Sequence, residues 1–435
     1  MTAVIGMLNK RGVALAADSA VTRSRGEAMK ITKNGNKMLR LSSANPVSVM
    51  ITGNASFLRI PWELIVRRYR NERGNVNHPT VENNVLDFFD FLQSSEIFWA
   101  EGKDHSWASF QLECLIVNIF HDMDLDSKAQ NKKGGLKRPG LFEKEFLRLL
   151  KKFRKRCAKG SLLQNCFSGY TLERFEKFIA KEWERYLEEN KEKEENVFDD
   201  PEIPTYLLEK HKEEILQTLL DILKADIHSS AAQLIFAGYG ADQEYPSLVP
   251  ATVAEGIDHN VNCHVYADQI IRISDSNPSA ICPFAQKDVI NGILMGAEGP
   301  SFSTGIMRKF YKLVNQGKLL EEAGLDSFEV MGSPWAEAAK GLDDALAAKL
   351  RRFRNNSLKK WERDLEGYDV RSMATLALSL IHLTGFQRIL TFAPEGVGGD
   401  VDLAVITRNE GFTWLNRKSW YHHKDIGGRY GSMGV

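Results

Sequence analysis

Threonine stands directly after the initiator methionine, at position 2 of the chain. Methionine is normally removed before a small residue, so we expect Thr2 to become the N-terminal residue of the mature chain. An N-terminal threonine carries a hydroxyl nucleophile and an α-amine base on one residue. Because the unperturbed pKa of an α-amine is about 7.7–8.0, an appreciable neutral fraction exists near pH 7. Thr2 therefore has the groups needed for nucleophilic attack on an amide.

Other chemistries lack their sequence signatures. The chain contains no P-loop, HExxH or GxSxG motif, and Gly238-Tyr239-Gly240 fails as a dinucleotide fingerprint because Gln243 replaces the third glycine. Residues 122–126 begin like a calcium loop, but Ser127 and Lys133 stand where the loop needs glycine and glutamate. We interpret them as a polar helix end and predict neither a metal nor an organic cofactor.

The elements that would position Thr2 begin as a sheet. Apolar runs over 3–8 and 13–17, separated by a polar turn, predict a hairpin, and further strands are predicted over 37–41 and 47–51. An apolar stripe between 58 and 69 then predicts a helix.

Strands and helices alternate in blocks along the rest of the chain. Strands, helices, strands, helices and strands in this order predict an α+β fold, with helices layered on antiparallel sheets. The later strands are predicted over 234–237, 247–254, 263–273, 401–407 and 411–417, and helices over 284–316, 335–365 and 371–387.

Composition changes sharply between the two sheet-forming parts. Residues 128–159 hold 13 Lys or Arg against two Glu, whereas 171–200 lean acidic. We predict two parts of one core separated by a charge-rich helical insertion. The predicted segments are 1–75 (core, first part), 76–204 (insertion), 205–417 (core, second part, with a helical elaboration at about 316–370) and 418–435 (flexible tail).

The basic stretch has two interpretations. Interleaved Phe142, Phe146 and Phe153 could form a surface for nucleic acid or a protein partner. The same residues follow helical spacing together with Leu149 and Leu150, which favours an amphipathic helix that faces the core of the insertion. We therefore do not expect nucleic acid as a partner.

Composition also bears on the compartment. The 435 residues include 57 basic and 57 acidic side chains, so no global field attracts nucleic acid or an anionic membrane. No apolar run approaches the roughly 18 residues of a spanning helix, and the N-terminus lacks the pattern of a signal peptide. The five cysteines form no CxxC pair and predict buried thiols in a reducing compartment. We expect a cytoplasmic protein that does not contact a membrane.

Several short segments form a recognisable series along the chain. They are Thr2–Gly6, Gly12–Asp18, Thr22, Lys33–Lys37, Ile51–Gly53, Gly398–Thr407 and Gly411–Phe412. Together they resemble the proteasome β-subunit family of N-terminal-nucleophile hydrolases. The order and nearly all the spacings match over the first 55 residues, and a closing Gly-Gly-x-x-Asp-x-Ala-Val-Ile hairpin is similar near the end. The match is weaker over 232–296.

The resemblance implies a fold and an activity. The fold would be a four-layer α-β-β-α sandwich, with the insertion between its first two core helices. The activity would be that of a bacterial-type, proteasome-like threonine peptidase, acting on peptide or protein substrates as a homo-oligomeric ring, with an ATP-dependent unfoldase as a candidate partner. Two alternatives remain: a non-proteolytic amidohydrolase acting on a small amide, and a catalytically inactive, ring-forming scaffold.

The resemblance also implies catalytic roles. Thr2 would be the nucleophile, and Asp18 would orient Lys37. The Lys37 cation would lower the proton affinity of the threonine. The backbone N–H of Gly53 would stabilise the oxyanion, because glycine allows a close approach of substrate.

Further positions correspond to substrate contacts in that family. Thr22, with the main chain around Gly35 and Ala55, would hold the substrate as an added strand. Val21, Gly35, Ile51 and Ala55 would line the first specificity pocket, which is expected to be apolar.

The chain departs from the family at three polar positions. Pro394 and Val397 replace an Asp-x-x-Ser, and Ala285 aligns with the serine of a Gly-Ser-Gly turn that opens the third helix. These groups normally hydrogen-bond the terminal amine, so their loss bears on activity more than on fold. Glu395 is the nearest acidic residue that could substitute.

Overall fold

The computed structural model describes most of the chain. The predicted features over 296–333, 391–397 and 419–435 lie outside the described residues, and so do Pro394, Glu395 and Val397. The described residues are 2–25, 28–32, 35–129, 139–155, 166–191, 202–225, 228, 231–295, 334–390 and 398–418.

Five strands form the first antiparallel sheet, in the order β13-β1-β2-β14-β15. The predicted N-terminal hairpin is its centre, and every residue of that hairpin's two strands is buried. The edge strand β13 was not predicted; it contains Pro283, which sheets tolerate mainly at edges. The strands are β1 (Ala3–Asn9), β2 (Gly12–Asp18), β13 (Ser279–Ala285), β14 (Val401–Thr407) and β15 (Gly411–Asn416).

The second antiparallel sheet has the order β11-β10-β9-β6-β5, and β12 also pairs with β10. Two short ribbons, β3–β4 and β7–β8, stand apart from both sheets. The elements are β3 (Val21–Arg25), β4 (Ala28–Thr32), β5 (Met38–Arg40), β6 (Val47–Gly53), β7 (Ser56–Phe57), β8 (Ile60–Pro61), β9 (Ala232–Gly238), β10 (Ser247–Ile257), β11 (Asn260–His264), η2 (Ala267–Gln269) and β12 (Ile271–Arg272).

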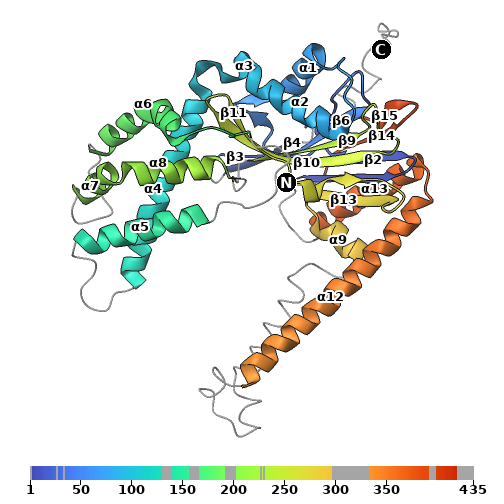
Figure 1. Ribbon diagram of the computed structural model, residues 1–435. Helices are drawn as coiled ribbons and strands as arrows, with labels where there is room; N and C mark the ends of the chain where they lie inside the picture. Colours follow the sequence, from blue (N-terminus) through green and yellow to red (C-terminus); the bar gives the residue numbers. More distant parts are fainter. Residues whose placement is uncertain are drawn as a thin grey trace.

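The two sheets face each other and carry helices on their other faces (Figure 1). Val4 and Leu15 of the first sheet share a buried cluster with Met50 and Leu248 of the second. Helices α1 and α2 cover the second sheet, whereas α9, α12 and α13 cover the first. The predicted α+β class is confirmed. These helices are α1 (Trp62–Glu72), α2 (Val81–Ser94), α9 (Asp288–Met295), α12 (Pro334–Glu366) and α13 (Val370–Leu390).

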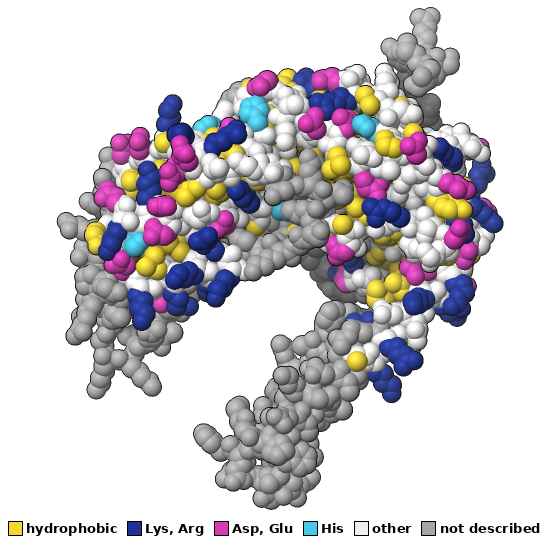
Figure 2. All heavy atoms as spheres, in the orientation of Figure 1, with side chains coloured by type: hydrophobic (Ala, Val, Ile, Leu, Met, Phe, Trp, Pro, Cys, Tyr) yellow, Lys and Arg dark blue, Asp and Glu magenta, His cyan; other side chains and the backbone are white. Residues whose placement is uncertain are grey.

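Helices α4 to α8 form a unit beside the sheets (Figure 1), whereas Phe98 and Trp99 of the short helix α3 pack with α1 and α2 on the second sheet. Phe146, Leu149 and Leu150 of α5 are buried in the core of this unit, so the basic stretch is an amphipathic helix where it is described. Lys and Arg side chains line the outer edge of the unit where α5 lies (Figure 2). The elements are α3 (Glu96–Trp99), η1 (Ala100–Gly102), α4 (Lys103–Ala129), α5 (Pro139–Lys155), α6 (Leu172–Lys191), α7 (Glu202–Lys210) and α8 (Lys212–Leu223).

The packed units differ from the predicted segments at both ends of the insertion. Helix α2 follows residue 76, yet its Val85 and Phe88 pack on the second sheet with α1. Helix α8 follows residue 204, yet its Leu216 and Leu219 belong to the core of the helical unit. The predicted polar helix end at 122–126 lies within α4.

Cys166 and Cys263 form a disulfide that joins the helical unit to β11, with their Cα atoms 6.6 Å apart. The expectation that all five cysteines are thiols is therefore wrong for this pair. The two residues are 97 positions apart, and their spacing in the sequence gave no sign of the contact. Among the described cysteines, Cys114 and Cys282 are free.

Helix α13 has the length and apolar composition of a membrane-crossing helix, although no such run was expected from the sequence. About a third of its apolar window, 33%, is buried inside the fold. Met373, Ala377 and Ile381 pack in the same cluster as Ala14 and Ala16 of β2. Packing on the first sheet thus accounts for part of the apolar composition of this helix.

Candidate active site

The Asp18 carboxylate is the centre of the candidate site. It lies at the end of β2, is 1% exposed, and accepts four hydrogen bonds from residues that the structure describes. Oδ1 accepts from the Lys37 ammonium at 2.7 Å and from the Ala3 N–H at 2.9 Å. Oδ2 accepts from the N–H groups of Gly398 at 3.2 Å and Ala20 at 3.3 Å. A buried carboxylate needs such donors because it has lost its water shell.

Lys37 directly precedes β5 and is 6% exposed, so its cation is nearly removed from water. Burial lowers its pKa below the ordinary value of 10.5, and the nearby cation of Lys418 acts in the same direction. The carboxylates of Asp18 and Asp402 oppose this shift. Lys37 is therefore a buried lysine whose charge depends on the balance of two carboxylates and one further cation.

Thr2 lies beside this pair, half-buried, at the residue before β1. Its carbonyl accepts a hydrogen bond from the Gln286 N–H at 3.1 Å. The next backbone N–H, that of Ala3, donates to Asp18. Because both groups belong to the peptide unit that follows Thr2, these two contacts fix the Thr2 backbone next to the Asp18–Lys37 pair.

Ala285 ends β13 at the turn before α9, with a φ of +61°. It pairs with Ala3 across the sheet, so this turn lies next to Thr2. The methyl side chain has no hydroxyl to offer the terminal amine, whereas the neighbouring Gln286 contacts Thr2 through its backbone.

Gly53 is the last residue of β6 and is exposed, with a φ of +79°. A Cβ at this position would lie 2.4 Å from the Ala231 carbonyl oxygen, so glycine is the residue that fits without movement. Two residues earlier, the Ile51 N–H donates to the Lys37 carbonyl at 2.8 Å. The end of β6 is thus tied directly to the segment that carries Lys37.

The predicted substrate-contacting residues fall into different environments. Val21 packs closely on Gly35, where an added Cβ would lie 2.2 Å from the Val21 Cγ2 atom. Ile51 is 7% exposed and belongs to the cluster beneath α1 and α2, whereas Ala55 is exposed. Thr22 pairs with Ile31 in the β3–β4 ribbon, and its side chain lies outside the described residues.

A loop after Gly53 is held by a residue that sequence reasoning missed. Glu255 of β10 accepts hydrogen bonds from the Leu58 N–H and, at 3.5 Å, from the Asn54 side chain. Leu58 and Arg59 have φ values of +45° and +63°, so they form the tight turn between β7 and β8. A carboxylate within the apolar run of β10 was the available signal. Burial raises the pKa of Glu255, and the two hydrogen bonds and Arg59 oppose this shift.

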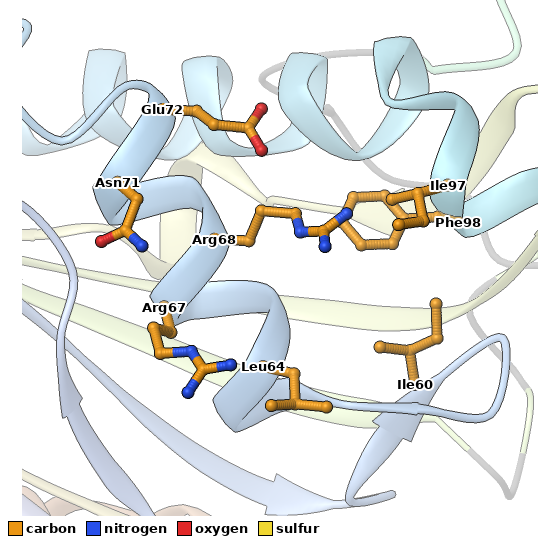
Figure 3. A pocket seen from close by; sticks show the side chains of 8 residues that line it. All are labelled: Ile60, Leu64, Arg67, Arg68, Asn71, Glu72, Ile97 and Phe98. Atoms are coloured by element: carbon orange, nitrogen blue, oxygen red, sulfur yellow. The ribbon is translucent and has the colours of Figure 1, made fainter.

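A separate hollow lies on the helical face of the second sheet (Figure 3). It has a volume of about 600 Å³, and the Arg68 side chain extends across it toward Ile97 and Phe98. None of Thr2, Asp18 and Lys37 lines it. The lining residues are Ile60, Leu64, Arg67, Arg68, Asn71, Glu72, Ile97 and Phe98.

No protein-family model matches this chain, and no curated protein matches its sequence.

Proposed function

We propose that this chain is a threonine-type peptidase whose nucleophile is Thr2, exposed by removal of Met1. One observation carries the proposal: a single oxygen of Asp18 accepts hydrogen bonds from both the Lys37 ammonium and the N–H that follows Thr2. A buried cation beside an N-terminal threonine favours the deprotonated hydroxyl. The resemblance to the proteasome β-subunit family supports the same roles.

The proposed reaction is amide hydrolysis in two steps. The Thr2 hydroxyl oxygen attacks the carbonyl carbon, its proton passes to the α-amine, and the Gly53 N–H stabilises the oxyanion. The C–N bond then breaks, and the departing amine takes the proton. Water attacks the resulting ester, releases the carboxylic acid product and restores the Thr2 hydroxyl.

The finer fold assignment belongs to the same proposal. Two facing antiparallel sheets with helices on their outer faces support a four-layer α-β-β-α sandwich of the N-terminal-nucleophile hydrolase type. By the same resemblance, we expect a homo-oligomeric ring in the cytoplasm, peptide or protein substrates and an ATP-dependent unfoldase as partner.

The test is intact mass spectrometry of the purified chain, before and after treatment with an epoxyketone or β-lactone directed at N-terminal threonine. We expect loss of Met1 and one adduct. The Thr2→Ala variant should lose Met1 and take no adduct, whereas Thr2→Ser should retain a hydroxyl and be labelled. Retained Met1, or a trimmed wild-type chain that stays unlabelled, would contradict the proposal.

A second candidate is a catalytically inactive scaffold, which the Ala285 methyl group favours because the family uses a serine there. An unlabelled but trimmed and folded chain would support it. The Ala285→Ser variant would then separate the two readings, since gain of labelling would identify the missing hydroxyl as the reason for inactivity.

A further inference from the structure

A second buried ion pair lies next to Lys37. Lys418 and Asp402 are 8% and 3% exposed, and their side chains meet at 3.1 Å between Nζ and Oδ2. The backbone N–H of Lys418 also donates to Asp402 Oδ1 at 3.0 Å, so one residue occupies both carboxylate oxygens. The predicted tail begins at 418, yet this residue is firmly placed against β14.

The Lys418 ammonium makes one more contact, with the carbonyl oxygen of Gly35. The Gly35 N–H donates to the Ser19 carbonyl at 2.9 Å, and Ser19 directly follows Asp18. Gly35 is therefore held at both of its backbone groups, once by Ser19, just after the strand that ends with Asp18, and once by Lys418.

Lys37 stands two residues after Gly35 in the same short segment. Its carbonyl accepts from the Ile51 N–H, and its ammonium reaches Asp18. Residues 35–37 thus run between the two sheets with a fixed contact at each end. Lys418 supplies one of the two contacts at the Gly35 end, and Ser19 supplies the other.

Burial of a lysine removes its hydration and its rotamer freedom, and both losses cost free energy. Good acceptors around the ammonium are needed to offset that cost. A purely apolar side chain would anchor the end of β15 without that cost. The orientation of the Lys418 ammonium toward Gly35 and Asp402 therefore points to a role in setting geometry.

We propose that Lys418 is a positioning residue of the Thr2 site: by holding the Gly35 carbonyl, it places Lys37 against Asp18 and fixes the Val21–Gly35 contact. This inference rests on the proposed function. The Lys418 cation also acts on Lys37 at a distance, where it lowers the pKa of that lysine together with burial and against the two carboxylates.

The variants separate geometry from anchoring. Lys418→Met keeps a side chain of similar length and removes the ammonium donors. Lys418→Met combined with Asp402→Asn also removes the Asp402 charge that the single variant leaves unpaired. Lys10→Met is the matched control, because Lys10 forms a surface pair with Asp275 at 2.7 Å and is far more exposed. The measured quantities are the thermal midpoint, the rate of Thr2 labelling by a β-lactone, and the pH dependence of that rate.

We expect the double variant to recover most of the thermal midpoint lost in Lys418→Met but to label at least tenfold more slowly than wild type. In Lys418→Met the alkaline limb of the pH–rate profile should move to higher pH, since the cation that lowers the pKa of Lys37 is gone. Lys10→Met should leave all three measured quantities unchanged. A double variant that labels at the wild-type rate would overturn the inference, and so would an unshifted alkaline limb in Lys418→Met.

Hydrogen exchange tests the same inference without activity. The Gly35 N–H donates to Ser19 and the Ile51 N–H donates to Lys37, and these two hydrogen bonds hold residues 35–37 in place. Both amides should therefore exchange at least tenfold faster in the double variant. Unchanged exchange there would overturn the positioning role. If wild type is never labelled by the β-lactone, the peptidase proposal fails, while faster exchange still supports the positioning of residues 35–37 by Lys418.

Discussion

Lys37 Nζ and Asp18 Oδ1 lie 2.7 Å apart, with side chains that are 7% and 0% exposed. The same oxygen accepts the Ala3 N–H, so the ion pair and the backbone beside Thr2 share one atom. A buried pair of this kind has lost its hydration on both sides, and removing either partner leaves an uncompensated charge. The pair therefore controls both the stability of this region and the position of Thr2.

The Asp18–Lys37 pair should be strongly coupled in stability. We expect Asp18→Asn or Lys37→Met alone to destabilise the chain by about 3–5 kcal/mol. The double variant should lose clearly less than the sum of the two, because it leaves no isolated charge. Urea unfolding of the four proteins gives the coupling free energy. Purely additive effects would contradict a coupled pair.

Lys37 should make stability depend on alkaline pH. Burial lowers the pKa of Lys37 in the folded chain below its ordinary value of 10.5. Between the folded pKa and 10.5, the unfolded chain therefore binds more protons than the folded chain. Stability therefore rises with pH across that window, as the buried cation is neutralised. Lys37→Arg, which stays protonated there, should lose this rise. The check is the difference in unfolding free energy between wild type and variant, measured from pH 8 to 10.5; a constant difference would contradict it.

The close contact of Gly35 with Val21 predicts a size-sensitive position. Gly35→Ala places a methyl group 2.2 Å from Val21 Cγ2, and such overpacking typically costs about 1–3 kcal/mol. Combining it with Val21→Ala should recover most of that loss, while Val21→Ala alone serves as the control. Chemical unfolding measures all three variants. A Gly35→Ala variant as stable as wild type would show that the contact is looser than described.

Glu255 should make the loop after Gly53 less stable as pH rises above 4.5. Burial raises the pKa of Glu255 in the folded chain above its ordinary value of 4.5. Between 4.5 and the folded pKa, the folded chain therefore binds more protons than the unfolded chain. The stability that this residue contributes is complete below pH 4.5 and is lost as pH rises through the folded pKa. Glu255→Gln keeps an acceptor for the Leu58 N–H and removes the charge. Its stability relative to wild type should increase with pH over that window, as followed by thermal unfolding; a flat difference would argue against a raised pKa.

The elements that sequence patterns predicted well are those with strong local signals. The β1–β2 and β14–β15 hairpins are continuous apolar runs around polar turns, and both occur in the sheet. The strand β13 carries Pro283, and the β3–β4 ribbon is largely polar, so neither has the pattern of a buried strand. Their pairing partners supply the hydrogen bonds that local sequence does not reveal.

Within the site, sequence determined which residue types stand near the N-terminus: a threonine, an acid at the end of an apolar strand, and a lysine before the next strand. Only the tertiary structure decided that Asp18 takes the Gly398 N–H as a donor, that Cys166 meets Cys263, and that Lys418 is buried against Gly35. Gly35 and Lys418 are 383 positions apart. A lysine after a hairpin has the same local sequence whether it is solvated or buried, because burial depends on which distant segments surround it.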